Sequence, residues 1–471
     1  MLFNSSVYFL FLTIVVLVYW RLPWRAQNVF LVAASYFFYG WWDWRFLSLM
    51  LASTLVDFYV AKGIASYQNP VQRRTLLIIS LVLNFTFLGF FKYCNFFIDS
   101  LATTLLALGV HNVPRHFLEI VLPPGISFYT FQAVAYVVDV YHKKLEPAES
   151  LVDYALFISF FPHLIAGPIQ RPDHLLPQTQ RPRIFHSGAF FDGLCLIVSG
   201  LFQKVVIADN CAILANAAFA GQFGKNGWAA LLGVYAFAWQ IYGDFSAYSN
   251  FARGSAQLMG FHFMVNFRQP YLATTLQDFW RRWHVSLSTW LRDYLYIGLG
   301  GNRKGERRTY INLMTTMLLG GLWHGANWTF VVWGAIHGVG LAIERFTLGR
   351  WKEWGHAERG WTVMWLQRVF VFHVVCLSWV FFRAPSLKGA GEYLEWLSRW
   401  NWHPAYGPAM VFLGCLGMTL LLSDLRLENH DEEYVFERTP EVRRVVLALA
   451  GLALTIIFSA SESNAFIYFQ F

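Results

Sequence analysis

The sequence predicts an all-α polytopic membrane protein, and three features of it support that prediction. Of 471 residues, 56% are hydrophobic, 19% aromatic and only 14% charged, whereas soluble domains are about 25% charged. Apolar stretches recur along the whole chain, and most extend with uncharged or aromatic flanks toward the roughly 20 residues that cross a bilayer core. The Lys and Arg residues gather in short loops between these stretches, as the positive-inside rule expects of cytoplasmic loops. An ordinary cytosolic protein is excluded, and the formal charge of +8 does not indicate a nucleic-acid partner.

The apolar stretches follow one another from the first residues to the last. The start of the chain has no basic n-region and no small-residue cleavage site, so we expect a retained first helix instead of a signal peptide. Arg21 and Arg25 place the first loop in the cytoplasm, and Arg443 and Arg444 do the same for the start of the last helix. Both ends then lie outside, which requires an even number of crossings, about twelve. The stretches are 8–19, 29–42, 76–91, 151–165, 229–242, 310–323, 328–343, 369–382, 410–422 and 445–458.

Three segments interrupt this hydrophobic rhythm. Residues 122–131, LPPGISFYTF, carry two prolines and a glycine, and residues 266–308 are aromatic yet too charged to cross lipid freely. Broken or polar backbone at membrane depth is tolerated only where protein buries it or water lines it. The first two segments therefore indicate a cavity. Residues 424–444 carry charges of both signs, and we expect a solvated connector or an interfacial amphipathic segment.

Two histidines are the main candidates for chemistry, because ionisable side chains inside membrane segments are costly and mark functional sites. His324 lies in the apolar LGGLWHGANW, where the glycines allow a slim substrate or another backbone to come close. His284 lies in WRRWHVSLSTW, within the polar segment 266–308. The alternative for His324 is a packing histidine bonded to a carbonyl, and for His284 an interfacial histidine in an aromatic belt.

Other polar residues support less specific predictions. His337 falls on a different helix face from His324, so we expect it to be structural. His163 and Asp244 either line a cavity or cap a broken helix. The glycine-rich residues 298–305 lack the Walker pattern, and a cytosolic anchor loop is the simpler interpretation. The five cysteines are isolated and support neither a disulfide framework nor a zinc site.

Acid–base catalysis by a histidine is the chemistry that remains once serine hydrolysis and paired-carboxylate catalysis are excluded. GxSxG is absent, and no paired carboxylates occur in the apolar stretches. A histidine base can take a proton from an alcohol or phenol as it attacks an activated carbonyl. A phenol, with a pKa of about 10, needs that help at neutral pH.

The chain resembles the membrane-bound O-acyltransferase (MBOAT) family, in particular its bacterial branch of alginate, peptidoglycan and cellulose O-acetylation proteins. The motifs that carry the resemblance run nearly end to end: PPGISFYTFQAVAYVVDVY, HLIAGPIQRP, YGDFSAYS, WRRWHVSLSTWLRDYLYIGLGGNRKG, LLGGLWHGANW, WVFFRAPS and the closing FIYFQF. The branch usually has an acid after GYS, whereas this chain has Ala247 and Asn250 in AYSN.

The resemblance implies a ring of about twelve tilted transmembrane and re-entrant helices around a funnel in the bacterial inner membrane. It further implies transfer of an acetyl group from cytosolic acetyl-CoA toward an exported polysaccharide of alginate, cellulose or peptidoglycan type. The family's essential histidine falls on His324, as general base, and His284 is its donor-positioning or oxyanion-stabilising partner. The donor phosphates are predicted to rest on Arg281, Arg282, Arg303 and Lys304, with no metal and no bound cofactor.

The closing FIYFQF resembles the C-terminal motif of a small separate protein used in D-alanylation of teichoic acids. We therefore divide the chain into an acyltransferase core, 1–444, and a final helix with a relay motif, 445–471. Tyr468 would accept the acyl group and pass it to a periplasmic acetyltransferase of the SGNH-hydrolase type. The alternatives are a tail that only seals the helix bundle, transfer of D-alanine or a longer acyl chain, and a non-catalytic export conduit with His324 lining its pore.

Overall fold

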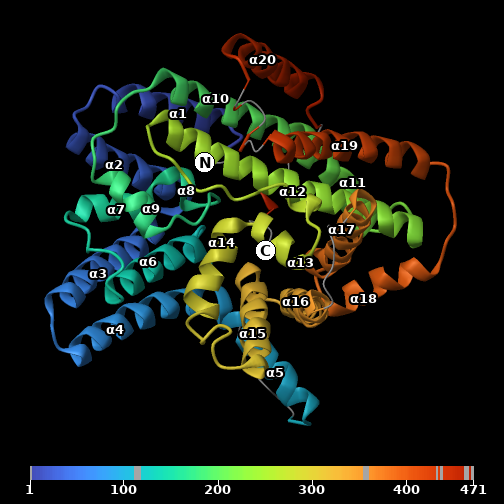
Figure 1. Ribbon diagram of the computed structural model, residues 1–471, viewed down its shortest axis with the longest axis horizontal. Coiled ribbons are helices and arrows are strands. Elements are labelled where there is room, and N and C mark those ends of the chain that lie inside the picture. Colours follow the sequence, from blue (N-terminus) through green and yellow to red (C-terminus); the bar gives the residue numbers. More distant parts are fainter. Residues whose placement is uncertain are drawn as a thin grey trace. The chain divides into compact units, whose positions relative to one another are not determined.

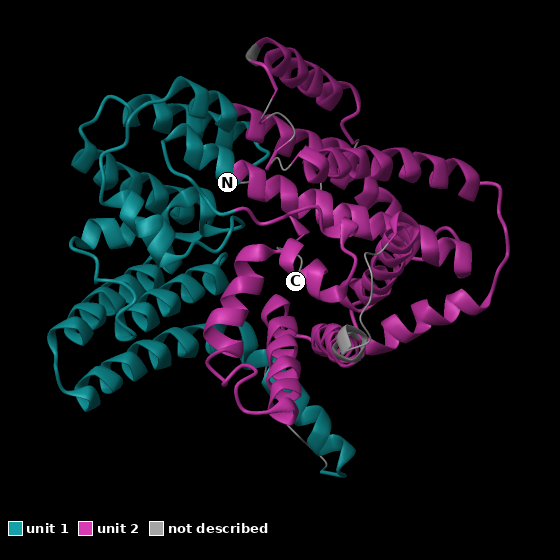
Figure 2. Cartoon of the chain, in the orientation of Figure 1, with its two compact units in different colours: residues 1–193, 252–264 teal, residues 194–251, 265–471 magenta. Residues whose placement is uncertain are grey.

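The computed structural model describes residues 3–110, 118–353, 360–430, 433–434, 437, 439–460 and 466–467. Within these ranges the chain is helical and contains no strand (Figure 1). Two compact units are formed by residues 1–193 with 252–264 and by residues 194–251 with 265–471 (Figure 2). We call them unit 1 and unit 2; two of their boundaries fall inside α10 and α12, and the third follows residue 264.

The helices of unit 1 are α1 (Ser6–Tyr19), α2 (Trp24–Asp43), α3 (Leu47–Ser66), α4 (Pro70–Leu88), α5 (Cys94–Ala107), α6 (Ile126–Tyr141), α7 (Leu151–Ser159), α8 (Phe161–Leu164) and α9 (Pro172–Thr179). Those shared between the units are α10 (Ser187–Phe202) and α12 (Gly227–Leu258). The helices of unit 2 are α11 (Asp209–Phe219), α13 (Leu276–Arg282), α14 (Val285–Trp290), α15 (Glu306–His324), α16 (Trp328–Glu353), α17 (Trp361–Arg383), α18 (Leu387–Glu395), α19 (Tyr406–His430) and α20 (Glu441–Ile457).

Five helical segments among the described residues are long and apolar enough to cross a membrane. They are Trp24–Ser66, Pro70–Ala107, Ser187–Phe219, Trp361–Arg383 and Tyr406–His430. The prediction of an all-α polytopic membrane protein is confirmed. The ring of about twelve helices and the boundary after residue 444 stay predictions.

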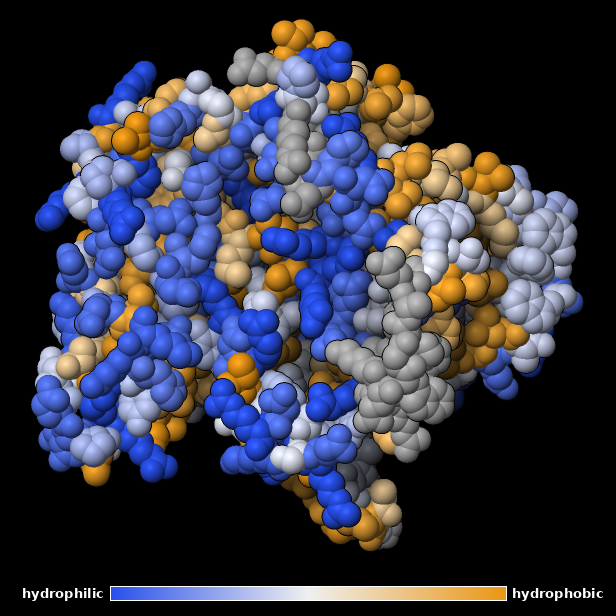
Figure 3. Space-filling model, viewed as in Figure 1, coloured by the Kyte–Doolittle hydropathy of each residue, from blue (hydrophilic) through white to orange (hydrophobic). Residues whose placement is uncertain are grey.

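Apolar side chains remain on the surface of α20, in keeping with a lipid environment. Val442, Leu449 and Ile456 of this helix are 77%, 62% and 71% exposed. In Figure 3, orange apolar residues colour part of the region that α20 occupies at the top of Figure 1. Helices can expose such a surface in a bilayer because their backbone hydrogen bonds are satisfied internally.

A buried polar cluster joins α3 to α4 inside unit 1. The Asp57 carboxylate accepts hydrogen bonds from Ser80 Oγ at 2.5 Å and from Asn84 Nδ2 at 3.0 Å. Ser53 Oγ donates to the same carboxylate at 3.2 Å. These donors replace the water that the carboxylate loses on burial, so the cluster links the two helices at a defined position.

The interruption predicted at residues 122–131 is confirmed. Residues 118–125 are not helical, and α6 begins at Ile126 after Gly125, whose φ is 74°. A side chain at Gly125 would collide with the carbonyl oxygen of Leu164. Glycine is therefore required twice here, for the left-handed backbone and for the close approach of residue 164.

The interruption predicted at residues 266–308 is also confirmed. The segment folds as the two short helices α13 and α14, a π-helical turn over Leu291–Tyr296 and a glycine-containing turn before α15. Short helices of this kind place several polar side chains inside one unit, where protein partners can satisfy them.

The prediction of a solvated connector at residues 424–444 is wrong for its first part. α19 continues to His430, and Asp424 is buried on it. The Tyr242 hydroxyl donates to Asp424 Oδ1 at 2.8 Å. Glu428 forms ion pairs with Arg282 and Arg368. Asp424 and Glu428, two of the charges that suggested a solvated segment, have partners inside unit 2, and sequence position alone does not reveal those partners.

Candidate active site

His284 is held in a strained backbone conformation between two short helices of unit 2. α13 ends at Arg282, and α14 begins at Val285. His284, between them, has φ 43° and ψ 54°, in the left-handed region. Non-glycine residues are uncommon there, and such strain gathers at functional sites. The conformation turns the chain so that α14 starts directly after the histidine.

Asn266 fixes both the backbone and the ring of His284. Its backbone carbonyl accepts the N–H of Val285 at 2.9 Å. Its side-chain Oδ1 accepts the N–H of Ser286 at 3.3 Å and the Ser286 hydroxyl at 2.9 Å, and lies 3.0 Å from His284 Nδ1. A backbone N–H can only donate, which identifies Oδ1 as the acceptor atom. Nδ1 of His284 therefore carries a proton, and when the ring is neutral its lone pair is on Nε2.

His324 is the last residue of α15 and is 4% exposed. The glycines around it bring another backbone close. A side chain at Gly321 would collide with the Phe330 carbonyl oxygen, and one at Gly325 with the Phe330 ring. Of the two expectations for these glycines, close approach of a backbone is confirmed. They allow α15 to pack tightly against α16 and so fix the position of the histidine.

The two predicted histidines meet in one buried site. Their ring centroids are 6.4 Å apart, and His284 is 0% exposed. The Phe245 ring lies 4.6 Å from His284, and the Trp333 ring lies 5.0 Å from His324. Aromatic walls of this kind keep water away, and polar interactions inside them are stronger than in water. The site therefore has two imidazoles, of which either can exchange a proton with a bound hydroxyl.

His337 has a different environment, as predicted for a structural residue. Its Nε2 lies 3.0 Å from the Ser378 hydroxyl, and its ring packs on Phe279, Trp280 and Trp333. His163 lies in unit 1, where it is 1% exposed and packs on Phe160 and Phe263.

Asp244 lines the same aromatic region of unit 2 and is paired. Lys204 forms ion pairs with Asp244 at 2.9 Å and with Asp209 at 2.8 Å, and all three side chains are at most 3% exposed. Neither Lys204 nor Asp209 was among the predicted residues. Lys204 could have been found from the sequence, because a single Lys in an apolar stretch marks a functional or structural site. Asn266 was missed as well, since a single Asn carries no comparable signal.

The C-terminal segment approaches this cluster. Phe466 and Ile467 are 0% exposed, and the Ile467 N–H donates to Asp244 Oδ2 at 2.7 Å. The Phe466 ring stacks on Tyr248 with centroids 3.9 Å apart. Tyr468, Phe469 and Phe471 lie outside the described residues, so the relay role of Tyr468 stays a prediction.

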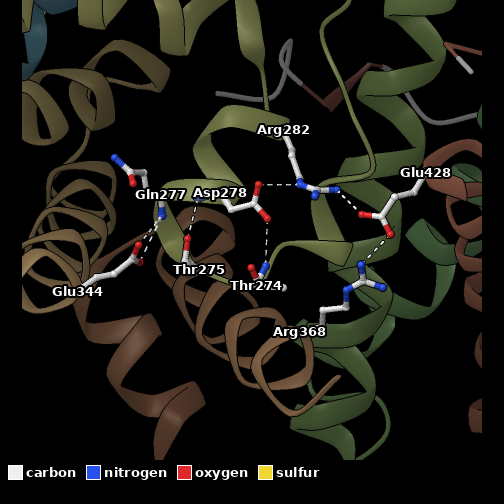
Figure 4. A network of polar contacts seen from close by, with 8 residues as sticks. All are labelled: Thr274, Thr275, Gln277, Asp278, Arg282, Glu344, Arg368 and Glu428. Atoms are coloured by element: carbon white, nitrogen blue, oxygen red, sulfur yellow. Dashed lines mark hydrogen bonds and ion pairs between the residues drawn. The ribbon is translucent and has the colours of Figure 1, made fainter. Parts of the chain in front are cut away.

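The four basic residues predicted to hold the donor have different surroundings. Arg281, Arg303 and Lys304 are exposed. Arg282 is engaged in a network at the end of α13 (Figure 4). Its guanidinium contacts Asp278 at 2.9 Å and Glu428 at 2.9 Å, and Glu428 continues to Arg368 at 2.7 Å.

This network anchors α13 at both ends. Burial lowers the pKa of Arg282, and its bonds and charge interactions with Asp278 and Glu428 more than reverse that, so the pKa is raised. At the other end of the helix, the Glu344 carboxylate accepts the backbone N–H of Leu276 at 2.7 Å. An anion at a helix N-terminus is stabilising. α13 thereby holds the loop that carries His284.

The part of α12 in which the sequence departs from its expected pattern has a structural role. Ala247 is buried, and the Asn250 amide donates to Gln203 Oε1 at 3.0 Å. The Ser246 hydroxyl donates to the same oxygen at 3.1 Å. An amide at residue 250 is thus well suited to its neighbour Gln203.

Residues 148–384 match MBOAT, the membrane-bound O-acyltransferase family. The chain belongs to this family. The matched region contains both His284 and His324 and confirms the resemblance that their motifs carry. Membership establishes a multi-pass membrane protein with O-acyltransferase activity.

Two curated relatives cover the whole chain, and a third covers part of it. The probable alginate O-acetylase AlgI of Pseudomonas putida is 40% identical, with 100% of this chain and 100% of the relative aligned. The peptidoglycan O-acetyltransferase of Helicobacter pylori is 33% identical, with 100% of this chain and 98% of the relative aligned. The teichoic acid D-alanyltransferase of Bacillus subtilis is 28% identical over 58% of this chain and 70% of the relative.

We predict that Gly321→Ala destabilises unit 2 whereas Gly320→Ala does not. At Gly321 the added methyl group collides with the carbonyl of Phe330, whereas at Gly320 it meets only the flexible Cδ1 of Leu291 at 3.0 Å. Overpacking of a core costs about 1–3 kcal/mol, and both changes gain the same helix propensity. Thermal unfolding of the purified variants in detergent measures the difference. Equal midpoints would contradict the close packing of α15 on α16.

Proposed function

We propose that this protein transfers acetyl groups from acetyl-CoA, across the bacterial inner membrane, for O-acetylation of an exported polysaccharide. The observation that carries the proposal is the buried pair His284 and His324 in a chain of the O-acyltransferase family. The names of the relatives support the acyl group and the acceptor class, since they include an alginate O-acetylase and a peptidoglycan O-acetyltransferase.

The proposed chemistry is attack of a hydroxyl on the thioester carbonyl of the donor. His324 takes the hydroxyl proton as the oxygen–carbon bond forms, and the carbon–sulfur bond then breaks. The proton leaves with the thiolate as coenzyme A thiol. A general base of this kind contributes about 100- to 10,000-fold to a rate.

His284 is proposed to position the reacting groups. With Nδ1–H directed at Asn266, the Nε2 of a neutral ring has the lone pair that can accept a hydrogen bond. A nitrogen that accepts a hydrogen bond can orient a hydroxyl or amide group of the bound reactants. It can stabilise an oxyanion only if it is protonated, because only then does it donate a hydrogen bond. Of the two roles expected for His284, the tautomer favours positioning.

The donor is proposed to reach the site from the side that carries the exposed basic residues Arg281, Arg303 and Lys304. Phosphate groups of coenzyme A need cations that are accessible to solvent. The side chains of these three residues are exposed and so meet that requirement. Arg282 is less suited, because Asp278 and Glu428 already engage its guanidinium.

The acceptor is proposed to be the phenol of Tyr468, which then passes the acetyl group to a periplasmic acetyltransferase of the SGNH-hydrolase type. The support is the neighbouring residue Ile467, which is buried beside Asp244 in the same unit as the histidines. Transfer of D-alanine is the second candidate, favoured by the similarity to the Bacillus subtilis D-alanyltransferase over part of the chain.

Incubation of the purified protein with labelled acetyl-CoA tests this proposal. We expect an acetyl group on the C-terminal peptide, detected by peptide mass spectrometry, that is absent in Tyr468→Phe and in His324→Ala. His337→Ala is the matched control, because His337 is a buried histidine of the same unit that packs on Ser378. Labelling of all variants alike, or only by a D-alanyl thioester, would count against acetyl transfer at this site.

Asn266→Ala is expected to slow labelling by about 100-fold, because a catalytic group displaced by about 1 Å loses that much. The change removes the acceptor of His284 Nδ1 and frees the ring to turn. Ser286→Ala is the control: it removes one donor to Asn266 and leaves the bond to His284 in place. A quenched time course of acetyl incorporation measures both. Similar losses in the two variants would mean that Asn266 acts on the fold of the loop and not on the ring.

A further inference from the structure

A compact ionic cluster lies inside unit 2, apart from the histidines. Lys204 lies on the π-helical turn Gln203–Ala208, Asp209 begins α11 and Asp244 lies in α12. Lys204 is 1% exposed and contacts both carboxylates within 2.9 Å. Buried charges are retained when opposite charges and hydrogen bonds compensate them. The pairing holds the Asp244 carboxylate in a fixed orientation.

The second oxygen of Asp244 binds the backbone of the C-terminal segment. Oδ2 accepts the Ile467 N–H at 2.7 Å. A hydrogen bond to an ionised acceptor is about twice as strong as a neutral one. Terminal residues ordinarily fray into water, whereas Phe466 and Ile467 are 0% exposed. A specific contact therefore brings this part of the chain into the core.

One face of α12 receives the segment. Tyr248 lies one turn after Asp244, and its ring stacks on Phe466 at 3.9 Å and an interplanar angle of 28°. Phe245 contacts Phe466 with ring centroids 6.0 Å apart. Stacked aromatic pairs contribute beyond their buried area. The hydrogen bond of Ile467 and the aromatic contacts of Phe466 together fix the positions of these two residues on α12.

The same helix connects the segment to the histidine pair. Phe245 directly follows Asp244, and its ring lies edge-on to His284, with centroids 4.6 Å apart and an interplanar angle of 88°. Phe466 is thus separated from His284 by one aromatic ring.

We propose that Asp244, oriented by Lys204, is a positioning residue that docks the C-terminal segment by accepting the Ile467 N–H. The bond sets the register of Phe466 and Ile467 on α12, and position 468 is the next in the sequence. The value of that position as an acyl acceptor rests on the proposed function. The docking does not, because it follows from the contacts of Ile467 and Phe466.

The docking is tested in the full-length protein by hydroxyl-radical footprinting with peptide mass spectrometry. Ile467→Pro removes the N–H that Asp244 accepts, and Ile467→Val retains it. We expect oxidation of Phe466 to rise roughly tenfold in Ile467→Pro and in Asp244→Ala, and to stay low in Ile467→Val, because a charge-assisted hydrogen bond is lost only in the first two. Trp333, 1% exposed in the same unit, must remain protected as the control for folding.

The exchange Lys204→Asp with Asp244→Lys, made together with Asp209→Asn so that no second carboxylate faces position 204, separates docking from a purely structural ion pair. It restores opposite charges but faces the Ile467 N–H with an ammonium group, which can only donate. We expect Trp333 to stay protected and Phe466 to be oxidised. Protection of Phe466 in Ile467→Pro and in the exchange variant would overturn the proposal.

Acetyl labelling separates this proposal from the proposed function. One glycine inserted between residues 467 and 468 should leave Phe466 protected and abolish labelling, because the phenol moves out of register. If the wild-type protein never takes up label but Phe466 responds to Asp244→Ala as expected, the relay is wrong and the docking stands. If Phe466 is oxidised as strongly in the wild type as in Asp244→Ala, the docking is wrong whatever the labelling shows.

Discussion

Polar side chains buried in this protein have to find their partners inside it, because the lipid around a membrane protein offers none. The structure follows from that constraint. Asp57 receives hydroxyl and amide donors across α3 and α4. Lys204 lies between two carboxylates, and Asn266 collects the donors of the His284 loop. Each pairing fixes two segments at one position, and within unit 2 the orientation of His284 depends on Asn266.

The histidine site illustrates how packing and hydrogen bonding divide this task. Glycines without side chains let α15 and α16 approach, which places His324 by steric fit. Asn266 places His284 by hydrogen bonds and selects its tautomer. A base placed by packing and a partner placed by an amide respond differently to mutation. The position of His324 is sensitive to side-chain volume added at the neighbouring glycines. The position of His284 is sensitive to loss of the acceptor oxygen of Asn266.

The sequence predicted those features that leave a local mark. Prolines, glycines and charges revealed the breaks at residues 122–131 and 266–308, and the motifs around His284 and His324 revealed the family. The expectation for residues 424–444 failed in its first part, up to His430, because the partners of Asp424 and Glu428 come from distant helices. Asn266 was missed for the same reason: its importance lies in what surrounds it. The helix ring and the role of Tyr468 stay predictions, since Tyr468 lies outside the described residues.

The central claim is that the buried histidine pair performs acyl transfer. The most direct measurement is the single-turnover release of coenzyme A thiol from acetyl-CoA by the purified wild-type protein and by His324→Gln, which keeps a polar side chain at that position. The account predicts a fall of about 100-fold or more, with Phe466 still protected from oxidation. A rate unchanged by the substitution in a folded protein would contradict it.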